Sequence, residues 1–466
     1  MELTHHSWVS CWGAWLATLA VILIPLHLLR RRKLNLPPGP KSWPIIGNLN
    51  LFTGPAPHRS VDALCKKYGP IVQLKFGSFP VVVCSSVEMA KAILKSHDAI
   101  FAYRPKMAAG KYTGYNFSNI TWSHYGPYFN QARKICTMEL FTAKRLKSYE
   151  HIRVEELNVL LKHLYESSGK PIALKDHLAD VSLNVISRVV LGKKYSNERQ
   201  NGIEITRHEL KEMIDELILL NGVFDIGDSI PWLGFLDLQG NIKRMKAVAK
   251  KFDRFLEQDL IAGATETSTL MLEWAFAELV KNPEILDKAR EELDRVIGKE
   301  RWFEEKDIVN LPFIEAIIKE TMRLHGAPML MPRMAREDCK VAGYDIWKGT
   351  QVLVNTWTIE RDPALWENPN EFFPERFLGK SIDVKGNDFE LLPFGAGRRM
   401  CPGYSHGLKV IQSSLANLLH GFTWKLPGNM SNKELNMEEV FKLANQKKNP
   451  LEVVAQPRLA PHLYNV

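Results

Sequence analysis

The chain has few cysteines, and their spacing excludes two common kinds of site. No two of them form a CxxC pair, and long stretches separate them. This pattern argues against a disulfide framework and against a structural zinc site. The six positions are Cys11, Cys65, Cys84, Cys136, Cys339 and Cys401.

Several other signatures are missing. There is no long basic run or arginine–aromatic array, so we expect no nucleic-acid partner. There is also no phosphate-binding loop, zincin helix, internal repeat or low-complexity tract. The pair Gly395 and Gly397 begins like a dinucleotide fingerprint, but Met400 stands where the third glycine is required. We therefore expect no flavin domain in this sequence.

What is present is the composition of an ordinary globular protein, with 45% hydrophobic and 24% charged residues in 466. A chain of this length buries a large core, either as one big domain or as several smaller ones. The net charge of +9 has two interpretations. It favours an acidic partner or an anionic membrane surface, or it reflects a generally solvated surface.

Residues 1–33 predict a membrane anchor with a basic stop. The segment Trp8–Leu29 contains no charged side chain. At about 1.5 Å per helical residue, it is long enough for a bilayer core of roughly 30 Å. Arg30–Lys33 follow, and by the positive-inside rule they keep the rest of the chain on the cytosolic side. A cleaved signal peptide is the alternative, but Met1–Thr4 includes no basic side chain.

Residues 34–44 predict a proline-rich hinge, because Leu36–Pro40 cannot continue a helix. Residues 45–466 form the body, in which helical patterns dominate and β-rich stretches are short. The fold class we expect is therefore mainly α with small β-sheets. The predicted strands are Ile71–Phe76, Val81–Cys84 and Val341–Ile346, and the predicted helices are Ser86–Ser96, Phe129–Leu140, Val181–Leu191, Ile203–Leu220, Ile242–Leu256, Leu270–Leu279 and Pro312–Leu324.

The most informative motif is the run Phe394–Gly403, in which one cysteine follows a glycine-rich turn and precedes an apolar-periodic helix. A cysteine at a helix N-terminus lies near unpaired N–H groups and the positive end of the dipole, which favours its thiolate. Such a thiolate at Cys401 can ligate a haem iron, and Arg399 can pair with a haem propionate. The alternative is an ordinary glycine loop with a free cysteine.

The motif resembles the haem-binding signature of the cytochrome P-450 superfamily, since Phe394, Gly397, Arg399, Cys401 and Gly403 have the spacing of that signature. The resemblance covers nearly the whole chain. It implies a cytochrome P-450 fold with an N-terminal transmembrane helix. It also implies haem b (iron protoporphyrin IX) as the cofactor, with Cys401 as the ligand of the metal.

The resemblance implies roles for further residues. Thr267 on the distal helix, with Glu266 beside it, is expected to be catalytic and to relay protons, work that needs a hydroxyl or carboxyl with access to water. Glu320 and Arg323, spaced i,i+3, are expected to form a buried network with Arg376. The expected cofactor-binding residues are Arg133, Arg333, Arg399, Phe394 and Cys401.

The implied activity is that of a haem-thiolate monooxygenase in the endoplasmic-reticulum membrane, single-pass, with a cytosolic catalytic domain. It would take O2 and receive electrons from NADPH-cytochrome reductase. The chain is similar to plant enzymes of specialised metabolism, including flavonoid hydroxylases. The expected substrate is small and apolar or aromatic, a flavonoid or phenolic, with a terpenoid as the second choice. The segments expected to shape the pocket are Ala108–Thr121, Leu219–Phe224 and Ala327–Met331.

The chain departs from the family pattern near residues 258–262. Eight residues separate Gln258 from Thr267, which is about 12 Å of helix. The family normally has a further helix and the front half of the distal helix here, so we expect part of the pocket wall to be missing. A second departure is Phe129, where the family usually has tryptophan. Phenylalanine lacks the indole N–H and so removes one propionate donor.

Two alternatives to a monooxygenase stay open. One is a catalytically inactive, shortened relic that binds haem without turnover, which the missing segment favours. The other is a haem-thiolate isomerase or dehydratase, which needs no reductase. Thr267 and Glu266 argue against the second alternative, because they suit oxygen chemistry.

Overall fold

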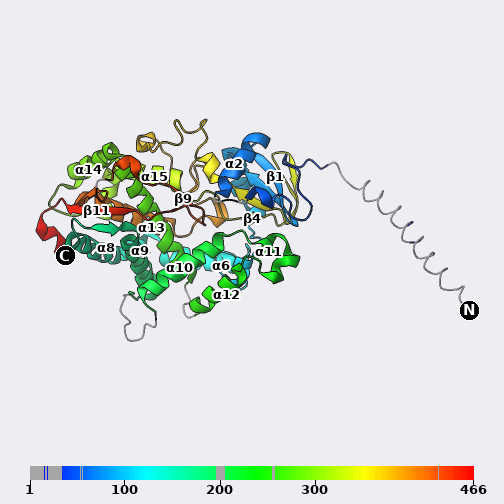
Figure 1. Ribbon diagram of the computed structural model, residues 1–466, viewed down its shortest axis with the longest axis horizontal. Helices are drawn as coiled ribbons and strands as arrows, with labels where there is room; N and C mark the ends of the chain where they lie inside the picture. The colour runs from blue at the N-terminus through cyan, green and yellow to red at the C-terminus, as the bar shows by residue number, and fades with distance from the viewer. Residues whose placement is uncertain are drawn as a thin grey trace, which may run out of the picture.

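The computed structural model describes residues 34–52, 54, 56–195, 205–253, 258–428 and 430–465, together with Trp15 and Thr18. Helices dominate this part of the chain, and the long helix α13 (Gln258–Lys281) crosses its interior against α9, α15 and α17 (Figure 1). The other longer helices are α2 (Pro57–Tyr68), α6 (Pro127–Ile135), α8 (Glu150–Glu166), α9 (Leu174–Leu191), α10 (Arg207–Gly222), α12 (Asn241–Phe252), α14 (Pro283–Ile297), α15 (Pro312–His325) and α17 (Tyr404–Gly421).

The strands are short and form small sheets. One has the order β1-β2-β7-β4, and another has the order β3-β11-β8. Two hairpins complete the set. The strands are β1 (Ile71–Phe76), β2 (Phe79–Cys84), β3 (Pro171–Ala173), β4 (Arg333–Met334), β5 (Cys339–Val341), β6 (Tyr344–Ile346), β7 (Gln351–Val354), β8 (Phe422–Lys425), β9 (Glu439–Val440), β10 (Gln446–Lys447) and β11 (Glu452–Pro457). The predicted class, mainly α with small sheets, is confirmed.

Most predicted elements are present, with shifted ends. The strand predicted at Val341–Ile346 is wrong: the chain turns there, and β5 pairs antiparallel with β6. Ala342 and Gly343 have φ of +49° and +84°, which suits the tight turn of a two-residue hairpin. The helices predicted at Ser86–Ser96 and Phe129–Leu140 each end in a π-helical turn, over Ala92–Ser96 and Cys136–Leu140.

Short helices complete the described part: α3 (Val87–Lys91), α4 (Asp98–Phe101), α5 (Ala108–Tyr112), α7 (Ala143–Ser148), α11 (Ile226–Ser229) and α16 (Thr356–Ile359). The helix predicted at Ile203–Leu220 begins at Arg207, because Thr206 and Glu209 form a capping box. The helix predicted at Ile242–Leu256 ends at Phe252 within the described residues.

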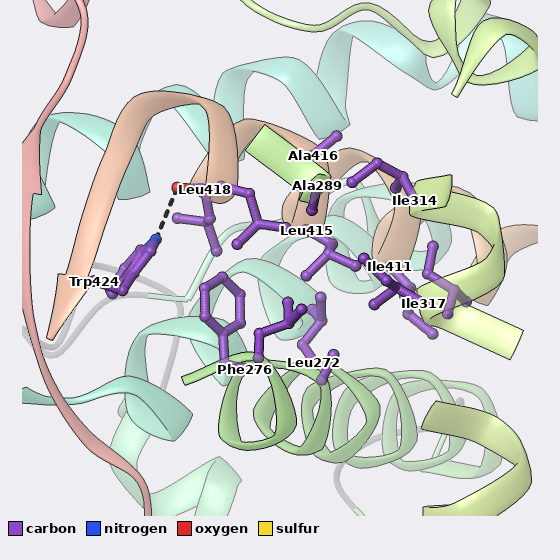
Figure 2. Close-up of a cluster of buried hydrophobic side chains, with 14 of the residues drawn as sticks. Leu272, Phe276, Ala289, Ile314, Ile317, Ile411, Leu415, Ala416, Leu418 and Trp424 are labelled. Atoms are coloured by element: carbon purple, nitrogen blue, oxygen red, sulfur yellow. Dashed lines mark hydrogen bonds between the residues drawn. The ribbon is translucent and has the colours of Figure 1, made fainter. Parts of the chain in front are cut away.

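The largest core lies where α13, α14, α15 and α17 meet, and Figure 2 shows part of it. Phe276 of α13 packs edge-on against Trp424 of β8, with ring centroids 4.9 Å apart. The Trp424 indole N–H donates to the Leu418 carbonyl at 3.0 Å. This core fixes α13 relative to α17, and α17 is the helix that directly follows the Cys401 loop.

The predicted hinge lies against the body. The Asn35 N–H donates to Asp345 Oδ2 at 2.9 Å, and the Gln73 N–H donates to the Pro38 carbonyl at 2.8 Å. A Cβ at Gly39 would lie 1.9 Å from the Gln73 carbonyl oxygen, so this contact requires glycine. The predicted anchor and basic stop lie outside the described residues, apart from Trp15 and Thr18. Among the helices that the structure describes, none has the length and apolar character needed to cross a bilayer.

Candidate functional site

The loop that carries Cys401 is closed by its own backbone. The Cys401 N–H donates to the Phe394 carbonyl at 2.9 Å, and the Met400 N–H donates to the Gly397 carbonyl at 3.0 Å. Gly397 has φ +69°, and a Cβ there would lie 2.3 Å from the Leu94 carbonyl oxygen. Only glycine fits this position, and the loop holds Cys401 in one place ahead of α17.

The Cys401 sulfur and the Phe141 ring both lie close to Gly403. A Cβ placed on Gly403 would lie 4.0 Å from Cys401 Sγ and 3.7 Å from the Phe141 ring. Burial raises the pKa of the Cys401 thiol, and the Gly403 N–H and Arg133 only partly offset it. The Gly403 N–H ahead of α17 favours the thiolate, in the direction expected, and burial opposes it. A bound metal ion would supply the remaining stabilisation, since metal coordination deprotonates a thiol.

Four arginines converge beside this loop: the predicted Arg133, Arg333 and Arg399, and also Arg104. Within the described residues, the acidic partner recorded for this group is Asp98, whose Oδ1 lies 2.9 Å from Arg333 Nη1. The other three donate to neutral backbone carbonyls. These acceptors are Thr121, Met331 and Pro332 for Arg104, Met400 for Arg133, and Ala102, Ile120 and Ser123 for Arg399.

The group carries an excess of buried positive charge. Burial, followed by the charges of Arg399 and Arg333, lowers the pKa of Arg104. Burial, followed by the charges of Arg333 and Arg133, lowers the pKa of Arg399 to about 9. Buried cations are normally paired with anions. The two propionate carboxylates of haem would supply the anionic partners for this group, so the residues fit haem.

Arg104 is the site residue that the sequence analysis missed. It is 6% exposed, and it interrupts an otherwise apolar stretch that leads into α5. A charged residue inside an apolar stretch is a signal, but a weak one, since Lys106 two positions later is exposed.

Phe129, which stands where the family usually has tryptophan, contacts Arg399 through its ring. Phe129 is buried, and the Arg399 guanidinium lies 3.9 Å from its ring centroid. A cation over an aromatic face is attracted to it. Phe129 therefore positions Arg399, although it cannot donate a hydrogen bond itself.

Thr267 lies on an open strip of α13. Gly263 and Thr267 are exposed, although Thr265, Glu266 and Ser268 around them are buried. A Cβ on Gly263 would meet no atom within 4 Å. Residues spaced by four share one face of a helix, so this face borders an open space. The Thr267 hydroxyl donates to the Gly263 carbonyl at 2.7 Å.

Glu266 lies on a different face of α13 and does not join Thr267. Its Oε1 is 3.0 Å from Lys175 Nζ of α9, and Asp215 of α10 also hydrogen-bonds to it. Burial raises the pKa of Glu266 to about 7, against the opposing charge of Lys175. The carboxyl can therefore hold or release a proton near neutral pH, although the helix backbone separates it from the open strip.

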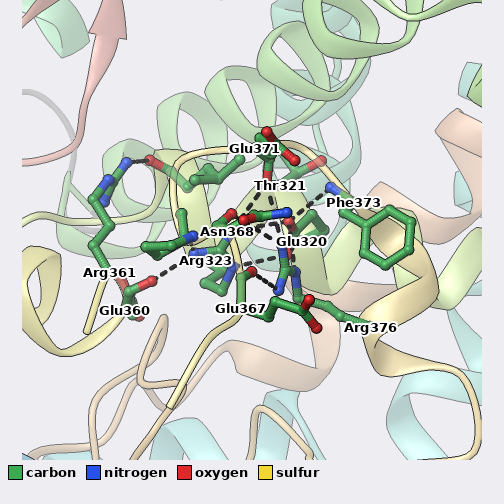
Figure 3. Close-up of polar contacts among 12 residues, drawn as sticks. Glu320, Thr321, Arg323, Glu360, Arg361, Glu367, Asn368, Glu371, Phe373 and Arg376 are labelled. Carbon is green, nitrogen blue, oxygen red and sulfur yellow. Dashed lines mark hydrogen bonds and ion pairs between the residues drawn. The ribbon is translucent and has the colours of Figure 1, made fainter. Parts of the chain in front are cut away.

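The predicted network of Glu320, Arg323 and Arg376 is present (Figure 3). Arg323 Nε donates to Glu320 Oε2 at 2.7 Å, and Arg376 Nε donates to Oε1 at 3.1 Å. The Phe373 N–H also donates to Oε1, at 2.9 Å. All three side chains are buried, so the network joins α15 to the segment that leads to the Cys401 loop.

The predicted pocket segments only partly meet. Ala108, Ala109 and Leu220 belong to one buried cluster with Ile261 and Ala262 of α13, and Met331 packs against it. In contrast, Phe224 stacks beside Phe441 and the ring of Phe76, in a separate cluster.

Comparison with known proteins agrees with this geometry. The family model described as Cytochrome P450 matches residues 37–261 and 257–451. The chain is 41% identical to trimethyltridecatetraene synthase of Zea mays, over 93% of this chain and 91% of the relative. It is 39% identical to flavonoid 3'-monooxygenase of Petunia hybrida, over 93% and 94%. It is also 39% identical to flavonoid 3',5'-hydroxylase of Campanula medium, over 93% of both chains.

A family match along most of the chain, relatives near 40% identity, and an arginine group suited to propionates all agree. The chain belongs to the cytochrome P450 family and is a haem-thiolate monooxygenase, using O2, a small-molecule substrate and a redox partner.

Proposed function

We propose that this P450 hydroxylates a small aromatic plant metabolite of the flavonoid or phenolic class. The observation that carries the proposal is the convergence of the Cys401 loop, four arginines and the open strip of α13. The relatives named as flavonoid hydroxylases supply the substrate class. Bound haem supplies the oxygen-activating chemistry.

Each part of the site has a proposed role. Cys401 ligates the iron, and Phe394 closes the loop behind it through its carbonyl. Arg133, Arg333 and Arg399 hold the propionates together with Arg104. Charge-assisted hydrogen bonds of this kind are about twice as strong as neutral ones, so the arginines also orient the porphyrin.

Replacing Arg104 with glutamine is expected to loosen haem. The change removes one charge-assisted contact worth roughly 1.5–3 kcal/mol, so haem transfer to apomyoglobin should become about 10 to 100 times faster. The transfer rate of Arg104→Lys should lie between those of the wild type and Arg104→Gln. Lysine keeps the charge but lacks the two parallel N–H donors of the guanidinium. The control is Arg59→Gln, an arginine that is 59% exposed and paired with Glu439. Equal transfer rates for both glutamine variants would contradict the role.

For proton delivery, Thr267 is the group on the open strip. Its hydroxyl can release the Gly263 carbonyl and donate toward the reacting oxygen instead, while it accepts a hydrogen bond from a water molecule. Glu266, with its pKa near 7, serves as a proton reservoir behind the helix. Delivery from Glu266 then requires water between the two faces, because the side chains do not meet.

A terpenoid is the second candidate substrate. Two relatives carry names of acyclic hydrocarbon synthases, trimethyltridecatetraene synthase and dimethylnonatriene synthase of Zea mays, the latter 38% identical over 94% of both chains. Their names therefore favour an acyclic terpenoid as the alternative to an aromatic ring.

Attachment to the endoplasmic-reticulum membrane is part of the proposal, with the catalytic domain in the cytosol. An exposed apolar surface supports it. Trp43 and Ile45 are each 64% exposed, and Phe235 is 82% exposed. The segment with Trp43 and Ile45 and the one that leads to Phe235 both contact the β1–β2 turn. There the Gly77 N–H donates to the Ile46 carbonyl, and the Ser78 N–H donates to the Ser229 carbonyl. Such a patch suits the interfacial region of a bilayer.

The proposed electron donor is NADPH-cytochrome reductase. A basic group around α6 and α7, exposed apart from the partly buried Arg133, supports docking of an acidic face, since complementary charge speeds encounter. In the described part of the chain, Arg145 pairs with exposed Glu139 and Lys147 with partly exposed Glu150, contacts that water screens. The group comprises Arg133, Lys134, Lys144, Arg145, Lys147 and Arg398.

We also propose that the chain is shortened between α12 and α13. The family match divides in this region, with one part ending at residue 261 and the other starting at 257. The pocket wall is then rebuilt from neighbouring segments, foremost the one that follows Arg104.

The test is expression of the full chain with a plant reductase, followed by the reduced carbon-monoxide difference spectrum and NADPH-dependent turnover. The panel is a flavanone, a simple phenolic and an acyclic terpenoid alcohol. Hydroxylated aromatic products are expected. Products from the terpenoid alone would favour the second candidate. A thiolate-type spectrum without any product would indicate a relic, and product without reductase would indicate the isomerase or dehydratase class.

A further inference from the structure

One segment of the proposed pocket, residues 107–123, is held in place in an unusual way. We call it the wall segment. Its residues Met107, Ala108 and Phe117 pack in the same cluster as Ala262 and Ala264 of α13. Ala264 precedes Thr267 by three residues, and residues at this spacing are neighbours on a helix surface. The wall segment therefore packs beside the part of α13 that carries Thr267.

The middle of the wall segment is strained. Tyr115, Asn116 and Phe117 are three consecutive residues with positive φ, at +48°, +54° and +63°. Left-handed backbone costs a non-glycine residue roughly 1–2 kcal/mol. Such a conformation persists only where the surroundings hold it. The strained turn therefore needs ties at its flanks.

Two carboxylates from other elements supply these ties. At one end, Asp228 of α11 accepts the Ala108 N–H at 2.6 Å. At the other end, Asp259 in the first turn of α13 accepts the Asn119 side-chain amide at 2.9 Å and the Ile120 N–H at 3.2 Å. Both ties cross from one element to another, and they lie on opposite sides of the strained turn.

The two carboxyls are in surroundings that disfavour their charge. Burial raises the pKa of Asp228 to about 7, the Ala108 N–H opposes this, and the nearby charge of Asp225 adds to it. Burial raises the pKa of Asp259 to about 6, against its hydrogen bonds from the wall segment. The other titratable groups that face Asp259 are Tyr115 and Cys136. Burial raises the pKa of both, and Asp253, which hydrogen-bonds to Tyr115, raises the pKa of Tyr115 further, so both stay neutral.

We propose that Asp228 and Asp259 are positioning residues that hold the strained wall segment closed over the substrate side of α13, and that loss of either tie opens it. The inference rests on the proposed function only in treating residues 107–123 as a wall of the substrate site. No property of the substrate enters it.

The direction of the pH dependence follows from the raised pKa values. A raised pKa means that the closed state binds protons more tightly than the open, hydrated state. Closure is therefore favoured most at low pH, and this stabilisation is lost as the pH rises through about 6 to 7. At position 228 an asparagine imitates the protonated acid, because its side-chain oxygen still accepts the Ala108 N–H. At position 259 it keeps only one of the two bonds, because its amide nitrogen donates and cannot accept.

The experiment is hydrogen exchange of the haem-loaded full chain between pH 6 and pH 8, corrected for intrinsic exchange. The reporters are the amides of Phe117 and Ser118, which donate to Gly110 and Gly114 and touch neither aspartate. Wild-type exchange is expected to rise with pH by roughly tenfold, the effect of about one hydrogen bond. Exchange in Asp228→Asn should stay slow at both pH values, and exchange in Asp259→Asn, which keeps one of the two bonds, should be intermediate at both. Exchange in Asp228→Ala and Asp259→Ala should be fast at both pH values.

A second readout uses 4-phenylimidazole, a small aromatic probe that binds haem iron and needs no turnover. Its association rate, followed by the Soret shift, should be about tenfold higher in both alanine variants, with an unchanged final spectrum. The control is Asp237→Asn, a carboxylate that accepts the N–H groups of Ile242 and Lys243 of α12 and has no recorded hydrogen bond to the wall segment. It should behave like the wild type.

Either of two results would overturn the inference. One is reporter exchange in the alanine variants that equals that of the wild type at both pH values. The other is faster exchange confined to the Ala108 or Ile120 amide, which would make each aspartate a local cap. The asparagine variants conserve volume, so they remain informative if an alanine variant fails to bind haem. None of these readouts depends on flavonoid turnover, so failure of the proposed function would be seen separately.

Discussion

Replacing Cys401 with alanine is expected to abolish the thiolate-type reduced carbon-monoxide difference spectrum and all oxygenation. The loop 394–403 has one thiol, and its place is fixed by the backbone hydrogen bonds of Cys401 and Met400. No other side chain can take over the ligand position without rebuilding that turn. The measurement is the difference spectrum per mole of purified protein, together with NADPH-dependent product formation.

Cys401→Ser separates ligation from packing. The hydroxyl fills nearly the same volume, but it ionises far less readily than a thiol, so the thiolate-type spectrum should also be lost. The control is Cys339→Ala. That thiol is partly buried in β5, and burial raises its pKa to about 11, so it stays protonated. Survival of the thiolate-type spectrum in Cys401→Ala would mean that another sulfur binds the iron.

The parts of the site that the sequence predicted are those with a local signature. The Cys401 loop is one, because its glycine and cysteine spacing is contained in ten consecutive residues. The pair Glu320 and Arg323 is another, since a spacing of three on a helix places both on one face. This spacing is common in surface ion pairs, and only the resemblance to the family indicated that the pair is buried and that Arg376 joins it.

The parts that the sequence did not reveal depend on contacts between distant segments. Arg104 becomes a site residue only because Met331 and Pro332, more than two hundred positions away, lie against it. The pairing of Glu266 with Lys175 depends on the position of α9, which no local pattern around Glu266 indicates. The ties at Asp228 and Asp259 likewise join elements with no shared sequence pattern.

Replacing Glu320 with glutamine is expected to prevent most of the chain from holding haem. Glu320 is fully buried and compensates two buried guanidinium groups, Arg323 and Arg376. Breaking a buried ion pair costs about 3–5 kcal/mol, because it leaves an uncompensated charge. A typical domain has only about 5–15 kcal/mol of stability. The measurements are the yield of the thiolate-type spectrum and the urea concentration at which haem is released.

The matched control is Glu315→Gln on the same helix. Glu315 is partly exposed, and its Oε1 is 3.5 Å from Gln412 Nε2, so the expected change in the urea midpoint is small. A midpoint for Glu320→Gln as high as that of the control would contradict the prediction.

A double variant tests why Glu320→Gln loses stability. If the uncompensated cations cause it, Glu320→Gln combined with Arg376→Met should hold haem better than Glu320→Gln alone, because one of the two cations is removed. If the lost hydrogen bonds cause it, the double variant should be worse, since the Arg376 Nη1 bond to the Glu367 carbonyl at 2.6 Å is lost as well. We expect the first result, because an uncompensated buried charge costs more than a single hydrogen bond.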